Sequence, residues 1–284
     1  MTWSGAQLHR SADSGSTYEA MLSSTNEATL GTAAGVLGDF TGGNVFDHVN
    51  SVSVVLNSGG PLVSYTQLQV LNGSGLCLLQ CTGGWEVLQY MTATLTATNT
   101  YTLSGLLRGR RGTEWAQGLH AAGNRFVLVD ASAFKRPNAG TAQIGLERLY
   151  KAVTFRKTLA AATPQSFTNN AAGLKPYAPV HLKGERDGSN NLTISATRRT
   201  RIGGEWRDFV DAQNGESTLL FDVEIWDSAY TTLRRTFAGL SLPTTPYSAA
   251  EQTTDGTTPG DPVYTRIYQI SGTVGRGYVL QGTV

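Results

Sequence analysis

The sequence predicts an all-β protein, on three observations. Threonine, valine and tyrosine recur at every second position in short segments, which is the period of a half-buried strand. Glycine-rich turn signals such as NSGG at 57–60 and DGSNN at 187–191 separate these segments. The chain also holds 33 glycines and only 15% charged residues, against roughly 25% in ordinary soluble domains. Short strands joined by many turns favour sandwiches or barrels.

The predicted strands follow one another along the whole chain. In order, they are residues 51–56, 66–71, 92–107, 125–129, 191–197, 218–227 and 263–272. Two segments, residues 11–22 and 112–123, are candidate helices, but both contain glycines that weaken them. We therefore expect any helix to be short.

With 284 residues, the chain is long enough for two domains. The predicted boundary lies in AAGLKPYAP, residues 171–179, where two prolines end one periodic region just before another begins. The sequence thus predicts a β-rich domain over residues 1–174 and a second domain over residues 175–284. Strand length and spacing in the second domain suit a seven-stranded sandwich of the fibronectin type III or immunoglobulin kind.

Two details of the second domain are also predicted. Ala196 stands where many such domains carry a core tryptophan, so Trp206 or Trp226 is expected to supply the aromatic volume. The polar, proline-rich stretch 242–262 is expected to form an exposed excursion between strands.

Composition excludes several classes of function. The net charge of +1 provides no general attraction to nucleic acid or to an anionic membrane. No segment approaches the ~18 apolar residues of a membrane span, and the first residues lack the layout of a signal peptide. We therefore expect synthesis in a cytoplasm, no membrane span and no specific nucleic-acid partner.

The cysteines and histidines do not predict a metal or cofactor site. Cys77 and Cys81 are spaced so that both fall on one face of a strand, and we expect two buried free thiols. The four histidines (His9, His48, His120 and His181) occur singly, without metal-ligand spacing.

No catalytic set is recognisable either. The candidate acids (Asp39, Asp47, Glu86, Glu114 and Asp130) lie in different predicted elements, and no nucleophile or metalloprotease motif occurs. Asp47 and His48 are adjacent, so on a strand they point to opposite faces and are expected to be two surface groups. The chain is therefore not expected to be an enzyme.

The stretch LRGRRGTEWA holds the first set of candidate interface residues. Arg108, Arg110 and Arg111 are expected to be exposed on a turn between glycines, near Glu114 and Trp115. The guanidinium groups either clamp carboxylates of a neighbouring subunit or bind local carbonyls and Glu114. In the first case the arginines contribute to assembly and little to folding.

A second basic run, ATRRTR, contributes Arg198, Arg199 and Arg201 on a predicted strand. These arginines form either a solvated strand face or a second contact between subunits. Contact with nucleic acid is the less favoured alternative.

Aromatic residues in GGWEVLQY suggest a further surface. Alternation places Trp85 on one face of the strand and Glu86, Leu88 and Tyr90 on the other. Trp85 and Tyr90 are either core or interface anchors or aromatics that stack on a ligand such as a sugar.

Several stretches together resemble the C-terminal region of the large baseplate protein of gene transfer agents and related siphophage tail-tip proteins. They are residues 4–19, 83–95, 101–116, 121–130, 173–182, 197–206 and 274–279, and LSGLLRGRRGTE is the most specific of them. The resemblance implies a subunit of the tail hub and tip that assembles around the tail axis as a homotrimer or ring.

The resemblance and the absence of catalytic motifs lead to one functional expectation. The chain is expected to be a structural component of a phage-like tail tip or baseplate, located in the virion and in contact with hub, distal tail, fibre or receptor-binding proteins. The alternative is an adhesin at the same tip that binds a receptor or glycan on the host surface. An adhesin would expose a concave aromatic patch, whereas an assembly protein buries its apolar surface on neighbours.

Overall fold

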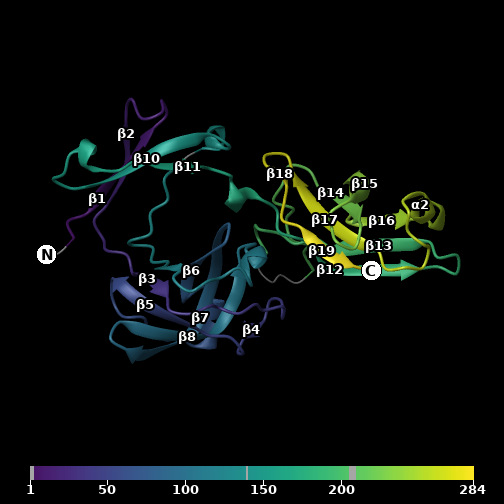
Figure 1. Ribbon diagram of the computed structural model, residues 1–284, viewed down its shortest axis with the longest axis horizontal. Helices are drawn as coiled ribbons and strands as arrows, with labels where there is room; N and C mark the ends of the chain where they lie inside the picture. The colour runs from purple at the N-terminus through teal and green to yellow at the C-terminus, as the bar shows by residue number, and fades with distance from the viewer. Residues whose placement is uncertain (1–2, 139, 205–208) are drawn as a thin grey trace. The chain divides into compact units, whose positions relative to one another are not determined.

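The computed structural model describes residues 3–138, 140–204 and 209–284. The chain forms two compact units, Met1–Asn170 and Ala171–Val284 (Figure 1). With 43% strand and 8% helix, the structure confirms the all-β prediction. No helix among the described residues is long and apolar enough to cross a bilayer.

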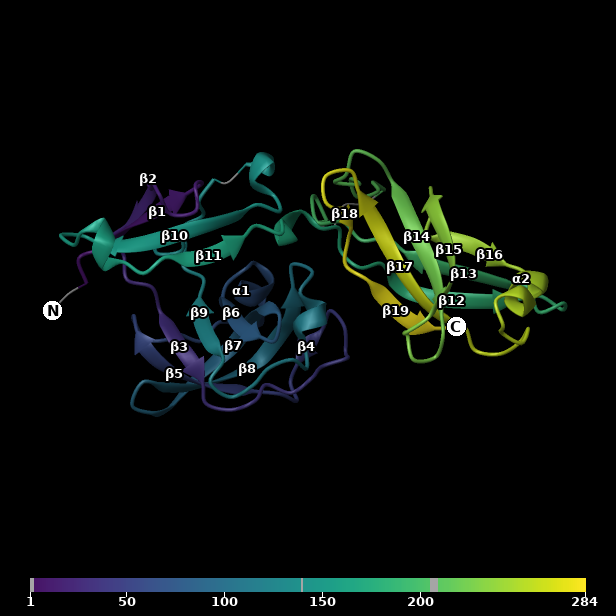
Figure 2. The ribbon, with the colours of Figure 1, turned by 45° about the horizontal axis from the view of Figure 1, so that its top comes forward.

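The first unit contains a closed antiparallel barrel (Figure 2). Its strands are β3 (Leu30–Ala33), β5 (Val52–Ser58), β6 (Leu76–Cys81), β7 (Gly84–Ala97), β8 (Thr100–Arg110) and β9 (Arg125–Leu128). Pairing runs β8-β5-β3-β9-β6-β7 and returns from β7 to β8, so the ring closes. A short strand, β4 (Phe46–Asp47), also pairs with β8.

Alternation along these strands produces the barrel core. In β6 every second residue is buried, and the core includes Val54, Leu79, Leu103 and Phe126, each at most 1% exposed. Cys77 and Cys81 are on the inward face as buried free thiols, as expected.

Residues 66–71, predicted to be a strand, instead contain the helix α1 (Gln67–Leu71). The side chain of Thr66 accepts a hydrogen bond from the Gln69 amide, and the Gln69 side chain accepts one from the Thr66 amide. This capping box satisfies amides that a helix start leaves without partners, and it outweighs the alternation. The prediction was therefore wrong here.

A separate four-stranded sheet completes the first unit, in the order β11-β10-β1-β2. Its strands are β1 (Ala6–Ser11), β2 (Glu19–Ser24), β10 (Glu147–Thr154) and β11 (Gln165–Thr168). The predicted helix over 11–22 is wrong, because this segment forms parts of β1 and β2 and the turn between them. Asp13 stabilises that turn by accepting hydrogen bonds from the Thr17 amide and hydroxyl.

Short 3-10 turns provide most of the remaining helical structure. They span Glu114–Ala116, Thr141–Gln143, Leu159–Ala161 and Ala172–Leu174. The candidate helix over 112–123 is thus reduced to the first of these turns.

The second unit is a β-sandwich, which confirms the predicted fibronectin type III-like fold. One sheet has the order β12-β13-β16, and the other has the order β15-β14-β17-β18, with β19 also paired to β17. The strands are β12 (Val180–Arg186), β13 (Leu192–Thr197), β14 (Leu220–Trp226), β15 (Leu233–Leu240), β16 (Thr244–Tyr247), β17 (Tyr264–Ser271), β18 (Gly275–Arg276) and β19 (Leu280–Thr283). One apolar cluster, which includes Ile194, Val223 and Ile267, joins the two sheets.

The aromatic core of this sandwich differs from the prediction. Tyr247 is fully buried and contacts Phe237, with ring centroids 6.1 Å apart. Trp226 lies on the opposite face of β14 from the core residue Ile225, and Trp206 lies outside the described residues.

The predicted excursion over 242–262 is also corrected. This segment contains β16 and the helix α2 (Ala249–Thr254), which begins with a capping box between Ser248 and Glu251. Gln252 is fully buried and donates to the carbonyl of Tyr247. The stretch is thus largely ordered, although its composition is that of a loop.

Candidate functional site

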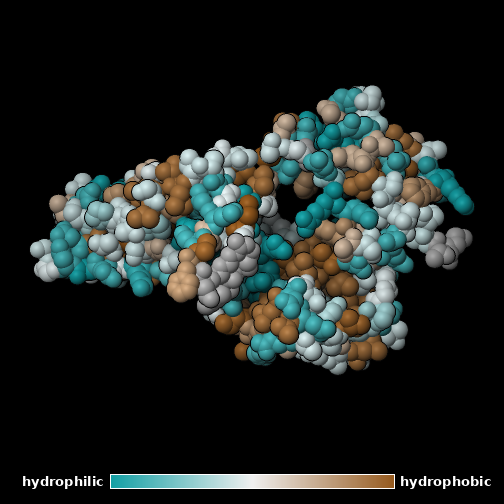
Figure 3. Space-filling model, turned by 180° about the vertical axis from the view of Figure 1, so that it is seen from behind, coloured by the Kyte–Doolittle hydropathy of each residue, from teal (hydrophilic) through white to brown (hydrophobic). Residues whose placement is uncertain are grey.

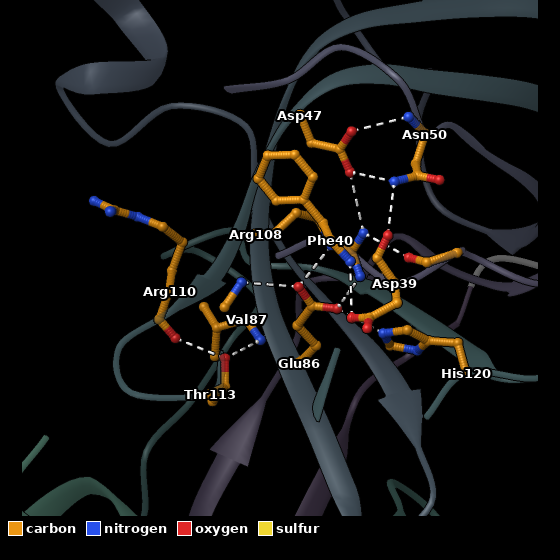
Figure 4. A network of polar contacts seen from close by, with 12 residues as sticks. Asp39, Phe40, Asp47, Asn50, Glu86, Val87, Arg108, Arg110, Thr113 and His120 are labelled. Carbon is orange, nitrogen blue, oxygen red and sulfur yellow. Dashed lines mark hydrogen bonds and ion pairs between the residues drawn. The ribbon is translucent and has the colours of Figure 1, made fainter. Parts of the chain in front are cut away.

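Four ionisable side chains meet inside the barrel unit: Asp47, Glu86, Arg108 and His120, here called the charge cluster (Figure 4). Arg108 Nε donates to Glu86 Oε1 at 2.8 Å, and Nη2 donates to Glu86 Oε2 at 2.9 Å. Both side chains are 0% exposed. This bidentate geometry is the strongest that arginine and a carboxylate form.

A second carboxylate completes the contacts of the guanidinium. Arg108 Nη1 lies 3.3 Å from Asp47 Oδ2 and donates to the carbonyl of Gly38 at 3.0 Å. Asp47 Oδ1 accepts from the backbone amides of Val49 and Asn50 at 3.0 and 2.9 Å. Asp47 is therefore fixed in place and buried, and its expected position as a surface group is wrong. The adjacent His48 is exposed.

His120 closes the charge cluster on the other side of Glu86. Its Nε2 lies 2.5 Å from Glu86 Oε2, and its Nδ1 lies 2.9 Å from the carbonyl oxygen of Gln80. Both neighbours are acceptors when Glu86 is ionised, so the two contacts require a hydrogen on each ring nitrogen. In that state two carboxylates face two cations, and the charge cluster has no net charge.

The surroundings of the two carboxyl groups keep them ionised. Burial raises the pKa of Glu86, but hydrogen bonds from His120 and Arg108 outweigh it and hold that pKa below its ordinary value. Burial likewise raises the pKa of Asp47, and hydrogen bonds from Asn50 and Val49 outweigh it. Among the described residues no three His, Cys, Asp or Glu side chains are grouped to hold a metal ion.

The backbone conformation of the turn explains the two glycines of RGRRGTE. Gly109 and Gly112 have φ values of 58° and 82°, in the left-handed region that side chains disfavour. A Cβ at Gly109 would lie 2.8 Å from Cα of Glu114. Thr113 closes the turn, because its hydroxyl donates to the Arg110 carbonyl and accepts from the Val87 amide.

The three arginines of this stretch therefore have different environments. Arg108 lies in β8, is buried and is neutralised within the chain, so its expected exposure on a turn and its contact with another subunit are wrong. Arg110 is half-buried, and its Nε and Nη1 donate to the amide oxygens of Gln89 and Asn44. Arg111 is exposed.

Glu114 and Trp115 are exposed, and Trp115 lies against the β6–β7 turn at Gly84. Their part in assembly, like that of Arg110 and Arg111, stays a prediction.

Arg198, Arg199 and Arg201 lie beyond the end of β13 rather than on the predicted strand, because β13 ends at Thr197. Arg198 pairs with Asp211 and Arg201 with Glu216, while Arg199 Nε donates to the Ala178 carbonyl. Each of the three arginines thus has a partner within the chain.

The two faces of β7 are as predicted. Glu86, Leu88 and Tyr90 point inward, and Tyr90 is 0% exposed, so the proposal that Tyr90 stacks on a ligand is wrong. Trp85 is half-buried.

The sequence did not predict that His120 and Asp47 are buried in the charge cluster. No pattern around His120 indicates burial, because the residue stands alone in the sequence. Burial of Glu86 could have been predicted, because alternation placed it with Leu88 and Tyr90 on one face of the strand.

Comparison with known families gives one match: residues 28–127 match a family model described as Rcc01698-like, C-terminal. The matched segment extends from just before β3 into β9, and so contains the barrel and the charge cluster. A search of curated proteins gives no match.

Solved structures show only a distant likeness. The rat CD45 extracellular region, domains d3-d4, is 14% identical over 55% of this chain and 71% of that chain, with a TM-score of 0.28. Chicken CNTN1 FN1-FN3 domains are 11% identical over 91% of this chain and 66% of that chain, with a TM-score of 0.28. Titin domains A168-A170 are 9% identical over 98% and 74%, also at 0.28. At this TM-score the likeness supports no functional assignment.

Proposed function

We propose that the chain is a non-catalytic structural component of a phage-like tail tip or baseplate. It assembles with hub, distal tail, fibre or receptor-binding proteins, as a homotrimer or ring around the tail axis. In this proposal it is made in the cytoplasm of a bacterial host and resides in the virion near the end that contacts the next host.

The observation that carries the proposal is the match of residues 28–127 to the Rcc01698-like, C-terminal model. That segment contains RGRRGTE, the most specific part of the resemblance to the baseplate protein of gene transfer agents. The description of the matching family and the resemblance both refer to the C-terminal part of a protein.

The chemistry of the barrel supports a structural function. Its buried carboxylates, Glu86 and Asp47, are engaged by Arg108, His120 and Asn50, and their pKa values are lowered. A general acid at neutral pH needs a raised pKa and access to substrate, and these groups have neither. The charge cluster instead fixes the positions of β4, β7 and β8.

The alternative is an adhesin that binds a glycan or receptor at the tip, and the structure supports it with fewer aromatic residues than the sequence suggested. Of its two candidate aromatics, Tyr90 is buried, which leaves Trp85 alone on the surface of β7.

The test is a cryo-electron microscopy map of intact particles in which the chain carries a tag after its last residue. We expect tag density at the tail tip, at a multiplicity that fits the tail axis. Tag density elsewhere, or particles that lack the chain and have normal tails, would contradict the proposal.

A further inference from the structure

An open groove of about 500 Å³ lies on the barrel unit beside Arg110. Apolar side chains from three elements line it: Val45 and Phe46 at β4, Leu71 of α1 and Leu107 of β8. The groove is therefore built by the barrel itself and does not depend on the second unit.

Arg110 is the cation of this groove, and a buried amide holds it in position. The side chain of Gln89 is 3% exposed and donates both of its amide hydrogens, to the carbonyls of Val70 and Ser74, at 2.7 and 2.8 Å. Its oxygen is thereby fixed toward Arg110 Nε, 3.1 Å away. Asn44 Oδ1 holds Nη1 at 2.9 Å.

The charge of Arg110 has no counter-ion among the described residues. Its hydrogen bonds there go to neutral amide oxygens, whereas Arg108 two residues earlier is paired with Glu86 and Asp47. Neither bond uses Nη2. A guanidinium that is held in place and half removed from water binds a carboxylate more favourably than a mobile surface group does.

The surroundings of the groove indicate the kind of ligand. Val45 and Leu71, which line the groove, are 56% and 58% exposed. Figure 3 shows one face of the molecule, on which brown, apolar residues stand among teal and white ones on the barrel unit. Exposed apolar surface in a groove is typical of protein contacts. Asn44, His48 and Gln67 also line the groove and add hydrogen-bonding groups beside Arg110, so the test below includes an acidic sugar.

We propose that this groove binds a segment of a partner protein in which a carboxylate stands next to an apolar side chain. The carboxylate pairs with Arg110, and the apolar side chain packs on Phe46 and Leu71. The inference rests on the proposed function in one respect only, namely that the partner is another tail protein.

The test is a titration of the isolated full-length chain, labelled with nitrogen-15 and observed by NMR. The probe is an acetylated and amidated pentapeptide with aspartate between two leucines, and the matched probe has asparagine in that place. Three chains are compared: the wild type, Arg110→Gln, and the control Arg111→Gln, which removes an exposed arginine of the same turn. Thermal unfolding of each variant checks that it is folded.

A second variant covers the case in which Arg110→Gln does not fold. Val45→Asp places a negative charge in the groove wall, and Leu95→Asp places one on an exposed position of β7 that does not line the groove. The first should weaken binding of the aspartate peptide and the second should not.

We expect the aspartate peptide to shift amide signals of α1 and β4 and to bind about fivefold more tightly than the asparagine peptide. Arg110→Gln should remove this difference, and Arg111→Gln should preserve it. Equal binding of the two peptides, or shifts outside the groove, would overturn the inference. So would equal shifts on addition of glucuronate alone, because the ligand class would then be an acidic sugar.

This titration needs no particles, so its result is independent of where the chain resides. Binding by a chain that is absent from tail tips would refute the proposed function alone. Loss of the groove interaction in a chain that is located at the tip would refute this inference alone.

Discussion

Arg108 and Glu86 form two parallel hydrogen bonds, at 2.8 and 2.9 Å, between strands β8 and β7 and out of reach of solvent. Glu86 Oε1 also accepts from the Gly109 amide at 2.8 Å. Removal of Arg108 would leave the buried carboxylates of Glu86 and Asp47 without the cation that they share. The stretch RGRRGTE therefore contributes to folding through its first arginine.

Arg108→Ala should lower the free energy of unfolding by about 3 to 5 kcal/mol, because it leaves Glu86 and Asp47 buried without their shared cation. Urea denaturation of the wild type and the variant measures this. Arg111→Ala, at an exposed position, should stay within about 0.5 kcal/mol. A similar small effect for both would mean that the charge cluster does not stabilise the fold.

Acid should destabilise the protein in part through Glu86. Its folded pKa is below the ordinary value of 4.5, so its contribution is complete above that pH and is lost as the pH falls through the folded pKa. In Glu86→Gln, stability should change less with pH below 4.5, by up to about 1.4 kcal/mol per pH unit. Urea denaturation at several pH values tests this.

Asp13 and Asp227, each with a pKa lowered to about 2 by hydrogen bonds to a threonine, are present in both proteins. Their acid dependence therefore cancels in the comparison with Glu86→Gln. Parallel pH profiles of wild type and variant would show that the pKa of Glu86 is the same in the folded and unfolded protein.

His120 should donate from both ring nitrogens in the folded protein, because Nδ1 faces the Gln80 carbonyl and Nε2 faces Glu86. Nitrogen-15 spectra of the histidine rings distinguish this state from either neutral tautomer. His48, which is exposed, provides a reference ring in the same sample. A single protonated nitrogen on His120 would mean that the carboxyl of Glu86 holds the proton.

Limited digestion with trypsin should cut first after Lys135, because the bond after Arg136 precedes Pro137 and resists trypsin. Lys135 is exposed in the segment between β9 and the 3-10 turn at Thr141–Gln143, and exposed segments of this kind are preferred cleavage sites. Mass spectrometry of the first fragments identifies the site.

Two other segments should resist digestion by a protease of broad specificity such as proteinase K. Trypsin does not test them, because residues 242–262 contain no lysine or arginine and Lys175 precedes Pro176. The proline, glycine and polar residues of 171–179 and 242–262 favour cleavage there, but Pro176 is buried and its carbonyl accepts from the Tyr278 amide. The stretch 242–262 contains β16 and α2. First cuts in either segment would contradict the packing described here.

Alternation predicted the strands β5, β9, β13, β14 and β17 well, because in each of them residues at alternate positions face the core. The same rule failed at residues 66–71, where an interaction between Thr66 and Gln69 three residues apart decides the conformation. A period-2 pattern over six residues contains no information on such capping.

The charge cluster was the least predictable feature. Asp47, Glu86, Arg108 and His120 lie on separate elements, and only closure of the barrel brings them together. A solvated arginine between glycines and a buried one have the same local sequence. What could be deduced was that Glu86 shares the face of Leu88 and Tyr90, so a buried carboxylate required a cation from elsewhere in the chain.

Closure of the barrel also affects how its binding partners can change in evolution. In a ring of strands each backbone edge is already paired, so a neighbouring subunit cannot extend the barrel sheet by adding a strand. The exception is β4, a two-residue strand that pairs with β8 alone and is too short to offer much of an edge. Recognition at the barrel must then depend on the shape and charge of side chains. Single substitutions on its outer surface can therefore give it new partners while the backbone pairing, and with it the scaffold, is inherited unchanged.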